Sequence, residues 1–153
     1  MHRDIYPKHC LKGLNMRKAI GQKNQRELIK TLDRIFSEYV RFSAANDDDN
    51  CRCITCGKWF HWKNIHCGHF ISRKEHATRY DEINCNPQCC HCNTFKQGNW
   101  LAYEASLIRR YGKNEIERLK EKALAGGKLT KDLLIEMIRK YQEKLKILKI
   151  EKF

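Results

Sequence analysis

Two Cys-x-x-Cys pairs carry the strongest chemical signal in this sequence: Cys53 with Cys56, and Cys89 with Cys92. Two thiolates three positions apart can converge on one ion without strain, and two such pairs supply the tetrahedral sulfur site that Zn²⁺ prefers in structural centres. Gly57 follows the first pair directly and permits the tight turn in which backbone N–H groups face the sulfurs. These four cysteines are therefore predicted to hold a structural Zn²⁺.

The remaining five cysteines are predicted to be small apolar core residues rather than ligands: Cys10, Cys51, Cys67, Cys85 and Cys90. Cys51 and Cys90 each lie two positions from a predicted ligand and could compete for the ion. A spacing of two intervening residues is the commoner one, so both are excluded from the zinc site.

The segment between the zinc pairs carries a second group of chemically capable residues. It contains His66-Cys67-Gly68-His69-Phe70-Ile71, then Asn84, and finally Asn93 immediately after the last zinc cysteine. This order resembles the HNH nucleases, in which a first His at a strand end is followed by a central Asn five residues before a Cys. A Cys-x-x-Cys pair with His or Asn directly after it completes that pattern. On this resemblance, the residues at the three positions that define the HNH motif are His69, Asn84 and Asn93.

The sequence is more similar still to the phage NinG/Rap recombination family, whose members resemble Holliday-junction and branched-DNA endonucleases. The stretches that match are Cys53–Gly57, Gly68–Arg73, Arg79–Asn84, Gln88–Cys89, Cys92–Asn99 and the predicted helix from Trp100 to Gly112. The resemblance covers about residues 50–120 well and the C-terminal helices loosely. It implies an HNH-type endonuclease with a small ββα-metal core.

Phosphodiester hydrolysis needs an attacking water, a base to take its proton, and positive charge on the developing oxyanion. His69 is the predicted general base, because an unperturbed imidazole has a pKa of ~6.5, close to working pH. Asn84 is expected to fix the loop and orient that imidazole. Asn93 and His66 are the predicted ligands of a catalytic divalent ion, which would act as a Lewis acid on the scissile phosphate.

His66 departs from the family pattern, in which Asp often lies three residues before the motif His. A carboxylate there would suit Mg²⁺, whereas imidazole suits Mn²⁺, Ni²⁺ or Zn²⁺ better. The catalytic ion is therefore left open between Mg²⁺ and Mn²⁺. Arg73 and Lys96 are predicted to hold DNA phosphates, with plain solvated charges as an equal alternative.

The charge of the chain favours a polyanionic partner. Its 153 residues contain 31 Lys and Arg against 18 Asp and Glu, a net charge of +13, and each third of the chain carries an excess of basic residues. Such a surface suits DNA, although solubility alone is the simpler explanation. No run approaches the ~18 apolar residues of a membrane span, and the N-terminus has no signal-peptide core. We therefore expect no membrane partner and a cytoplasmic location in a bacterial or phage-infected host cell, where nine cysteines serve metal rather than disulfides.

Apolar periodicity identifies the elements that must position these residues. Helices are predicted over residues 22–45 and 100–111, the second ended by Gly112. Asn114 and Thr130 are the predicted caps of two further helices, the first of which ends at Gly126-Gly127. The alternating aromatics of residues 59–62 predict a strand or hairpin. The three tryptophans are predicted to lie in the core rather than to stack on bases: Trp59, Trp62 and Trp100.

The sequence therefore predicts an α+β fold, in which a zinc-stabilised, HNH-like ββα-metal core over residues 51–99 is flanked by helices. Residues 1–50 form a basic arm and helix, and residues 100–153 a helical extension. The predicted function is cutting of branched DNA in phage recombination. A non-catalytic zinc module that binds DNA, and an HNH nicking or homing nuclease on linear duplex, are the alternatives. A homodimer would suit a four-way junction, with the apolar stripe of residues 28–40 or 134–148 as interface, or else as an intramolecular contact.

Overall fold

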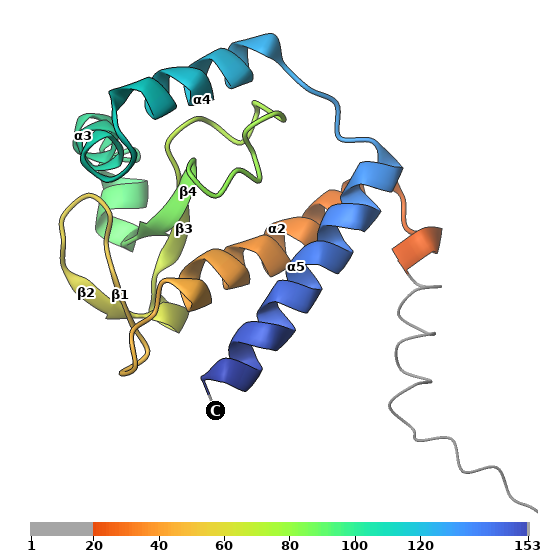
Figure 1. Ribbon diagram of the computed structural model, residues 1–153, viewed down its shortest axis with the longest axis horizontal. Helices are drawn as coiled ribbons and strands as arrows, with labels where there is room; N and C mark the ends of the chain where they lie inside the picture. The colour runs from red at the N-terminus through yellow and green to blue at the C-terminus, as the bar shows by residue number, and fades with distance from the viewer. Residues whose placement is uncertain (1–19, 153) are drawn as a thin grey trace, which may run out of the picture.

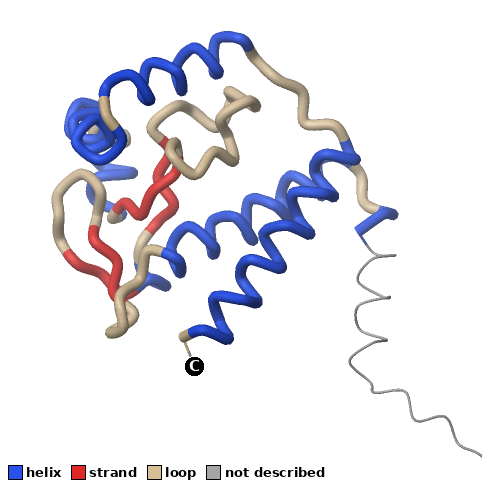
Figure 2. Tube along the Cα trace, in the orientation of Figure 1, coloured by secondary structure: helices blue, strands red, loops and turns tan. Residues whose placement is uncertain are grey.

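The computed structural model describes residues 20–152, which form a mixed α+β domain of helices and two small antiparallel sheets (Figures 1 and 2). The elements are α2 (Gln25–Ser43), β1 (Asn50–Arg52), β2 (Trp59–His61), the 3₁₀ turn η1 (Trp62–Asn64), β3 (His66–His69), β4 (Cys85–Gln88), the short π-type helix η2 (His91–Phe95), α3 (Trp100–Tyr111), α4 (Lys113–Ala125) and α5 (Lys131–Glu151). The predicted α+β class is thus confirmed. The basic arm predicted for residues 1–20 lies outside the described residues, except for its last residue.

Local capping fixes the start of α2. The Asn24 side chain accepts a hydrogen bond from the backbone N–H of Glu27, and the Glu27 carboxylate accepts one from the backbone N–H of Asn24. This capping box satisfies two N–H groups that the first helical turn leaves without partners. The buried face of the helix follows helical spacing through Leu28, Leu32, Ile35, Phe36 and Val40.

α5 lies along α2 and runs in the same direction (Figure 1). Thr130 caps α5, as predicted, by accepting a hydrogen bond from the backbone N–H of Leu133. Near its other end, the Lys149 ammonium lies 2.8 Å from the Glu38 carboxylate, and Lys152 donates to the carbonyl of Phe42. The two apolar stripes considered as dimer interfaces face each other in one core, so their alternative role, intramolecular packing, is confirmed.

Two antiparallel strand pairs carry the residues of interest. β1 pairs with β2, and the first Cys-x-x-Cys pair follows β1 in the turn between them. β3 pairs with β4 so that His66 lies opposite Gln88 and His69 lies opposite Cys85. Because successive side chains of a strand point to opposite faces, His66 and His69 fall on different faces of β3.

α3 and α4 cover the other side of the β3–β4 pair. Gly112, at φ +87°, both ends α3 and immediately precedes α4, which begins at Lys113. The prediction that Asn114 caps α4 is therefore wrong, because the glycine leaves no spacer and Asn114 already lies inside the helix. These helices pack Tyr103, Leu107, Ile116 and Leu119 against Phe70 in a core of their own.

The core assignment of the tryptophans is correct only for Trp62, which packs against two hydrophobic clusters. Trp59 is 58% exposed, because it lies on a two-stranded sheet that none of residues 20–152 covers on that side. Trp100 is 49% exposed: one face of its ring stacks on Phe70 at 5.7 Å, and much of the remainder is open to solvent. Among the described helices, none combines the length and apolar character needed to cross a membrane.

Candidate metal and catalytic sites

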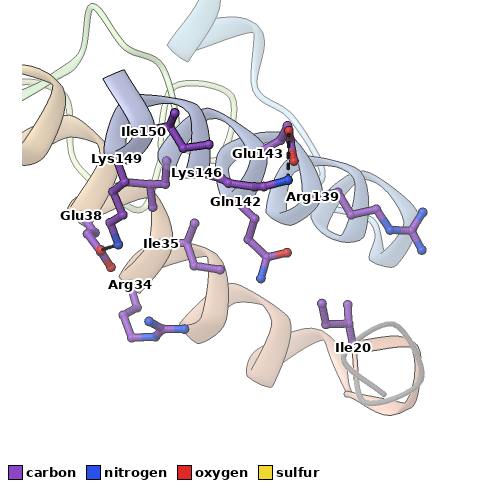
Figure 3. A pocket seen from close by; sticks show the side chains of 11 residues that line it. Ile20, Arg34, Ile35, Glu38, Arg139, Gln142, Glu143, Lys146, Lys149 and Ile150 are labelled. Atoms are coloured by element: carbon purple, nitrogen blue, oxygen red, sulfur yellow. Dashed lines mark hydrogen bonds and ion pairs between the residues drawn. The ribbon is translucent and has the colours of Figure 1, made fainter. Parts of the chain in front are cut away.

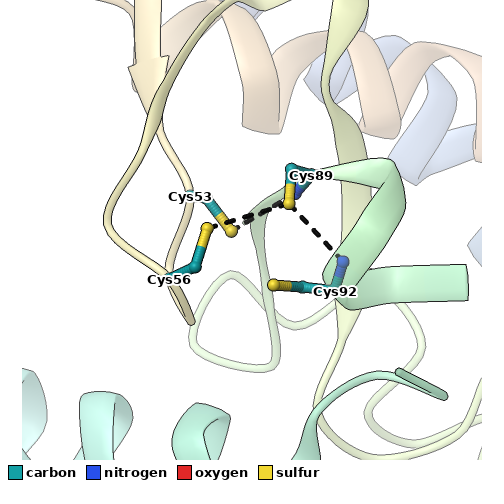
Figure 4. A group of neighbouring side chains, drawn as sticks. All are labelled: Cys53, Cys56, Cys89 and Cys92. Atoms are coloured by element: carbon teal, nitrogen blue, oxygen red, sulfur yellow. Dashed lines mark hydrogen bonds between the residues drawn. The ribbon is translucent and has the colours of Figure 1, made fainter. Parts of the chain in front are cut away.

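The four predicted zinc cysteines converge in space. Their sulfur atoms all lie within 4.8 Å of one another, two from the turn after β1 and two from the start of η2 (Figure 4). The Sγ atoms of Cys56 and Cys89 are 3.8 Å apart, and a tetrahedron with Zn–S arms of ~2.3 Å has edges of roughly 3.8 Å. The cluster could therefore hold a metal ion such as zinc.

Backbone geometry aims donors at the sulfurs of this cluster. Gly57 adopts φ +74°, as its predicted turn requires, and the N–H of Cys89 points at Cys53 Sγ over 3.3 Å. Burial opposes ionisation of Cys53, but the N–H groups of Cys56 and Cys89 outweigh it and lower the pKa of Cys53 to about 6. Burial, together with the neighbouring Cys92 and Cys53 sulfurs, raises the pKa of Cys89 to about 12. The Cys53 thiol therefore ionises readily, whereas the Cys89 thiol resists ionisation. A bound cation would allow all four cysteines to become thiolates.

The hydrophobic cluster around these sulfurs is small. Apart from the cysteines, its buried members among residues 20–152 are Ala45 and Ile65. A core of this size buries too little apolar surface to hold the β1–β2 hairpin and η2 together without further cross-linking. A metal ion would supply that cross-link.

His66 and Asn93, the predicted ligands of the catalytic ion, are in contact. Asn93 lies within η2, directly after Cys92, and its side-chain amide is 3.1 Å from His66 Nδ1 on β3. Two adjacent ligand atoms of an octahedral ion with bonds of 2.0–2.1 Å are separated by roughly 3.0 Å. The Asn93 amide nitrogen faces the imidazole here, and a half-turn of the amide would bring its oxygen to the same position.

His69 lies apart from that pair, on the face of β3 that is turned toward α2. It lines a cavity of about 370 Å³ whose rim includes Lys30, Arg34 and Arg73. Its Nε2 atom is 3.1 Å from the Arg79 carbonyl oxygen, which can only accept, so Nε2 carries the proton of the neutral ring and Nδ1 is unprotonated. Burial, aided by the charge of Arg73, lowers the pKa of His69 to about 4, whereas the sequence-based prediction took an unperturbed value.

Asn84 fixes the loop between β3 and β4, as predicted. Fully buried, it donates to the carbonyls of Ile71 and Thr78 and accepts from the backbone N–H of Ile71. Thr78 immediately precedes Arg79, whose carbonyl holds the His69 ring. Asn84 therefore acts on the imidazole through the loop rather than by direct contact.

The same loop is tied to α2 by a network that the sequence did not reveal. The Arg79 guanidinium makes two hydrogen bonds to the Asp33 carboxylate, the shorter 2.7 Å, and Tyr80 donates to the same carboxylate over 2.9 Å. Bidentate pairs of this kind fix orientation as well as position. No local spacing links residues 46 positions apart, so sequence patterns carried no signal for this contact.

The two predicted phosphate-binding residues are both exposed but lie in different places. Arg73 lines the cavity beside His69, and Lys96 directly follows η2, three residues after Asn93.

A larger hollow of about 1080 Å³ lies between α2 and α5 and is lined by residues such as Arg34, Gln142 and Lys146 (Figure 3). None of the predicted catalytic or metal-binding residues lines it, so the candidate chemistry belongs to the smaller cavity and to the His66–Asn93 pair.

Two cysteines that were assigned to the core lie next to His69. Cys67 Sγ, Cys85 Sγ and one ring nitrogen of His69 fall within 4.8 Å of one another. The i, i+2 spacing of Cys67 and His69 on one strand was the available signal, because such residues share a face. The contribution of Cys85 depends on strand pairing, which the sequence does not specify.

Comparison with known proteins gives consistent matches to one family. The family model for the bacteriophage lambda NinG protein matches residues 11–151. The chain is 29% identical over 124 residues to protein ninG of Escherichia phage 933W, covering 79% of this chain and 58% of that protein. It is 28% identical to the ninG proteins of Salmonella phage P22 over 124 residues and of Escherichia phage lambda over 94 residues, covering 57% and 43% of those proteins. The chain thus spans about half the length of the curated relatives it matches, and no solved structure matches it.

Proposed function

This chain belongs to the bacteriophage lambda NinG family, and from that premise we propose that it is a metal-dependent DNA endonuclease acting on branched DNA. The family match bears out the predicted NinG resemblance. The proposed reaction is hydrolysis of a phosphodiester at Holliday-junction-like DNA during phage recombination, leaving 5′-phosphate and 3′-hydroxyl ends. The proposed fold is an HNH-like ββα-metal core made of β3, β4 and η2.

The state of His69 is the observation that carries the proposal. Its ring is held by the Arg79 carbonyl, so the unprotonated Nδ1 is the atom that can accept a proton from an attacking water. The lowered pKa keeps the ring unprotonated at working pH, and it also makes this imidazole a weaker base than a free histidine. The basic rim of the adjoining cavity suits a phosphate group, with Arg73 as the proposed contact.

His66 and Asn93 are the residues that would hold the catalytic ion, proposed to be Mg²⁺ or Mn²⁺. Such an ion would supply Lewis acidity to the scissile phosphate. Because His66 and His69 lie on different faces of β3, the ion and the base could reach one phosphate only if the end of β3 moved when DNA bound. The contact between the two side chains supports a shared ligand role. The four-cysteine cluster, with Zn²⁺ as the proposed structural ion, fixes η2 and therefore Asn93, while Lys96 on the same turn is the second proposed phosphate contact.

A zinc module that binds DNA without cutting it is the main alternative, supported by the net charge of +13. This alternative requires the cysteine cluster but assigns no function to His69. A nicking or homing nuclease on linear duplex is the third reading, and it shares the chemistry but not the branched substrate.

The test compares cleavage of a four-way junction, a nicked duplex and a linear duplex under Mg²⁺ and under Mn²⁺. The wild-type chain should cut the junction fastest. His69→Ala should keep the zinc of the four-cysteine cluster and its DNA affinity while cutting falls about 10²–10⁴-fold, the usual loss on removal of a general base. His76→Ala is the matched control, because His76 is an exposed histidine of the β3–β4 loop and should cut as wild type.

Three outcomes would contradict the proposal. Cleavage by His69→Ala at the wild-type rate removes the proposed base. Tight binding by the wild-type chain without cleavage under either ion favours the binding module. Equal cutting of all three substrates favours a nuclease of linear duplex.

A further inference from the structure

A second cluster of metal-binding side chains lies on the β3–β4 pair, separate from the four-cysteine cluster. Cys67 and His69 alternate along β3, and Cys85 lies opposite His69 on β4. Both cysteines are buried in the core shared with α2 and α5, whereas the four-cysteine cluster belongs to another core. The two groups therefore depend on different parts of the fold.

We propose that Cys67, Cys85 and His69 form a second site for a soft divalent cation of the Zn²⁺ class, with a fourth coordination position open to the cavity beside α2. Two thiolates and one imidazole are a donor set that Zn²⁺ and Co²⁺ favour over hard ions such as Mg²⁺. Three protein ligands with one open position is the arrangement of a reactive or exchangeable zinc site, in contrast to the closed four-cysteine site.

The geometry supports an ion at this point. The two sulfurs and the imidazole nitrogen lie within 4.8 Å of one another, and the edges of a tetrahedral site are roughly 3.3–3.8 Å, so small side-chain rotations bring them to binding distance. Cys67 and His69 also line the cavity of about 370 Å³, which gives an ion a path inward and room for a fourth ligand.

The charges around the site set the chemistry of that fourth ligand. Two thiolates neutralise a divalent ion, so its presence adds no net charge to the buried cluster. Lys30, Arg34 and Arg73 on the rim favour an anion at the open position, and the nearby Asp33 is already engaged by Arg79 and Tyr80. Hydroxide or inorganic phosphate has the required charge.

The alternative is that Cys67 and Cys85 only fill space. Plain filling leaves their grouping with an imidazole unexplained. An ion would instead use all three side chains at once.

One consequence rests on the proposed nuclease function, although the site itself does not. An ion at this site occupies the side chain that the nuclease needs as a base, so excess Zn²⁺ should inhibit cutting. The binding test below contains no DNA, so it can succeed or fail independently of any nuclease activity.

The test is the zinc content of the full chain after equilibration with excess Zn²⁺ and removal of unbound ion, with Co²⁺ absorption as a second probe. We expect a second zinc equivalent in the wild-type chain, which Cys67→Ala/Cys85→Ala should lose while it keeps the first. Cys51→Ala is the matched control. Cys51 is also buried, but its thiol donates to the Arg41 carbonyl and is part of neither group of potential metal ligands. The second zinc equivalent should therefore remain in this variant. The Co²⁺ protein should show thiolate-to-metal absorption for the second equivalent.

A single equivalent in the folded wild-type chain overturns the site, and so does a second equivalent that persists in the double variant. A disulfide between Cys67 and Cys85 in the protein as purified also overturns it. If the double variant does not fold, His69→Gln leaves both cysteines in place and must lose the second equivalent for the proposal to stand.

Discussion

Gly68 lies between His66 and His69 on β3, and replacing it with alanine should destabilise the fold measurably. A Cβ atom at this position would lie 2.7 Å from the Cβ of Gln88, closer than real Cβ atoms approach, and would also collide with Oε1 of that side chain. Gln88 cannot simply move aside, because it is fully buried and its amide donates to the Gly98 carbonyl over 2.6 Å.

Three effects set the magnitude. Overpacking of a closed site costs about 1–3 kcal/mol, and displacement of Gln88 from Gly98 loses a hydrogen bond worth about 0.5–1.5 kcal/mol. Replacing a strand glycine with alanine also reduces the conformational entropy of the unfolded chain, which raises the free energy of unfolding by about 0.5–1 kcal/mol. The collision outweighs that gain, so Gly68→Ala should lower the free energy of unfolding by roughly 1–3 kcal/mol.

The assay is urea denaturation of the zinc-loaded chain. Gly21→Ala is the control: a Cβ there meets nothing within 4 Å, so it should show only the stabilisation of about 0.5–1 kcal/mol that acts through the unfolded chain. In a Gln88→Ala background the colliding atoms beyond Cβ are absent, so the cost of Gly68→Ala should fall by at least about 0.5 kcal/mol. A Gly68→Ala variant as stable as wild type refutes the reasoning, as does a cost that is identical in both backgrounds.

Four further predictions follow from the proposed site. Cys53→Ser should lose zinc and either solubility or fold, and a soluble, folded variant with its zinc intact would contradict the structural role. DNA affinity should fall with salt at a log–log slope of about −5 if six phosphates are contacted, and a flat dependence between roughly 50 and 200 mM salt would exclude DNA as partner. Because the pKa of His69 is lowered to about 4, protonation removes the base only below that pH. The cutting rate should therefore rise through about pH 4 and be level by neutral pH, whereas a rising limb near the ordinary ~6.5 would contradict the buried environment. His66→Asp should shift the preferred ion from Mn²⁺ towards Mg²⁺, and an unchanged preference would exclude His66 as a ligand. Asn93→Ala should lose cutting activity that a higher metal concentration partly restores, and an unchanged cutting rate would exclude Asn93 as a ligand.

Sequence reasoning succeeded where a structure is set by neighbours in the chain. The spacing of Cys53 and Cys56, with Gly57 after them, predicts a tight turn that brings their two sulfurs together, and the structure contains that turn. Thr130 before an apolar stripe predicted a capped helix for the same local reason. Such features need few long-range contacts, so a pattern of residue types is sufficient to predict them.

The rest depended on pairing between distant segments. Strand alternation separates His66 from His69, yet only the packing of β3 against α2 decides that His69 becomes half-buried and that its pKa falls. The exposure of Trp59 follows from the absence, among the described residues, of a layer over its sheet, which composition cannot indicate. Cys67 and Cys85 are core residues, as predicted, but only the register of β4 against β3 places them beside His69.

The two halves of the candidate site are therefore supported by different cores. Asn93 follows Cys92 directly, so its position depends on the four-cysteine cluster, whose surroundings contain little other apolar surface. His69 is held by the Arg79 carbonyl, and Arg79 is bound to Asp33 of α2, whose other face packs on α5. Loss of the structural ion should therefore release the His66–Asn93 pair while the His69 cavity persists. The proposed base and the proposed ion-binding pair therefore depend on different cores, so the proposed reaction should be lost when either core is disrupted.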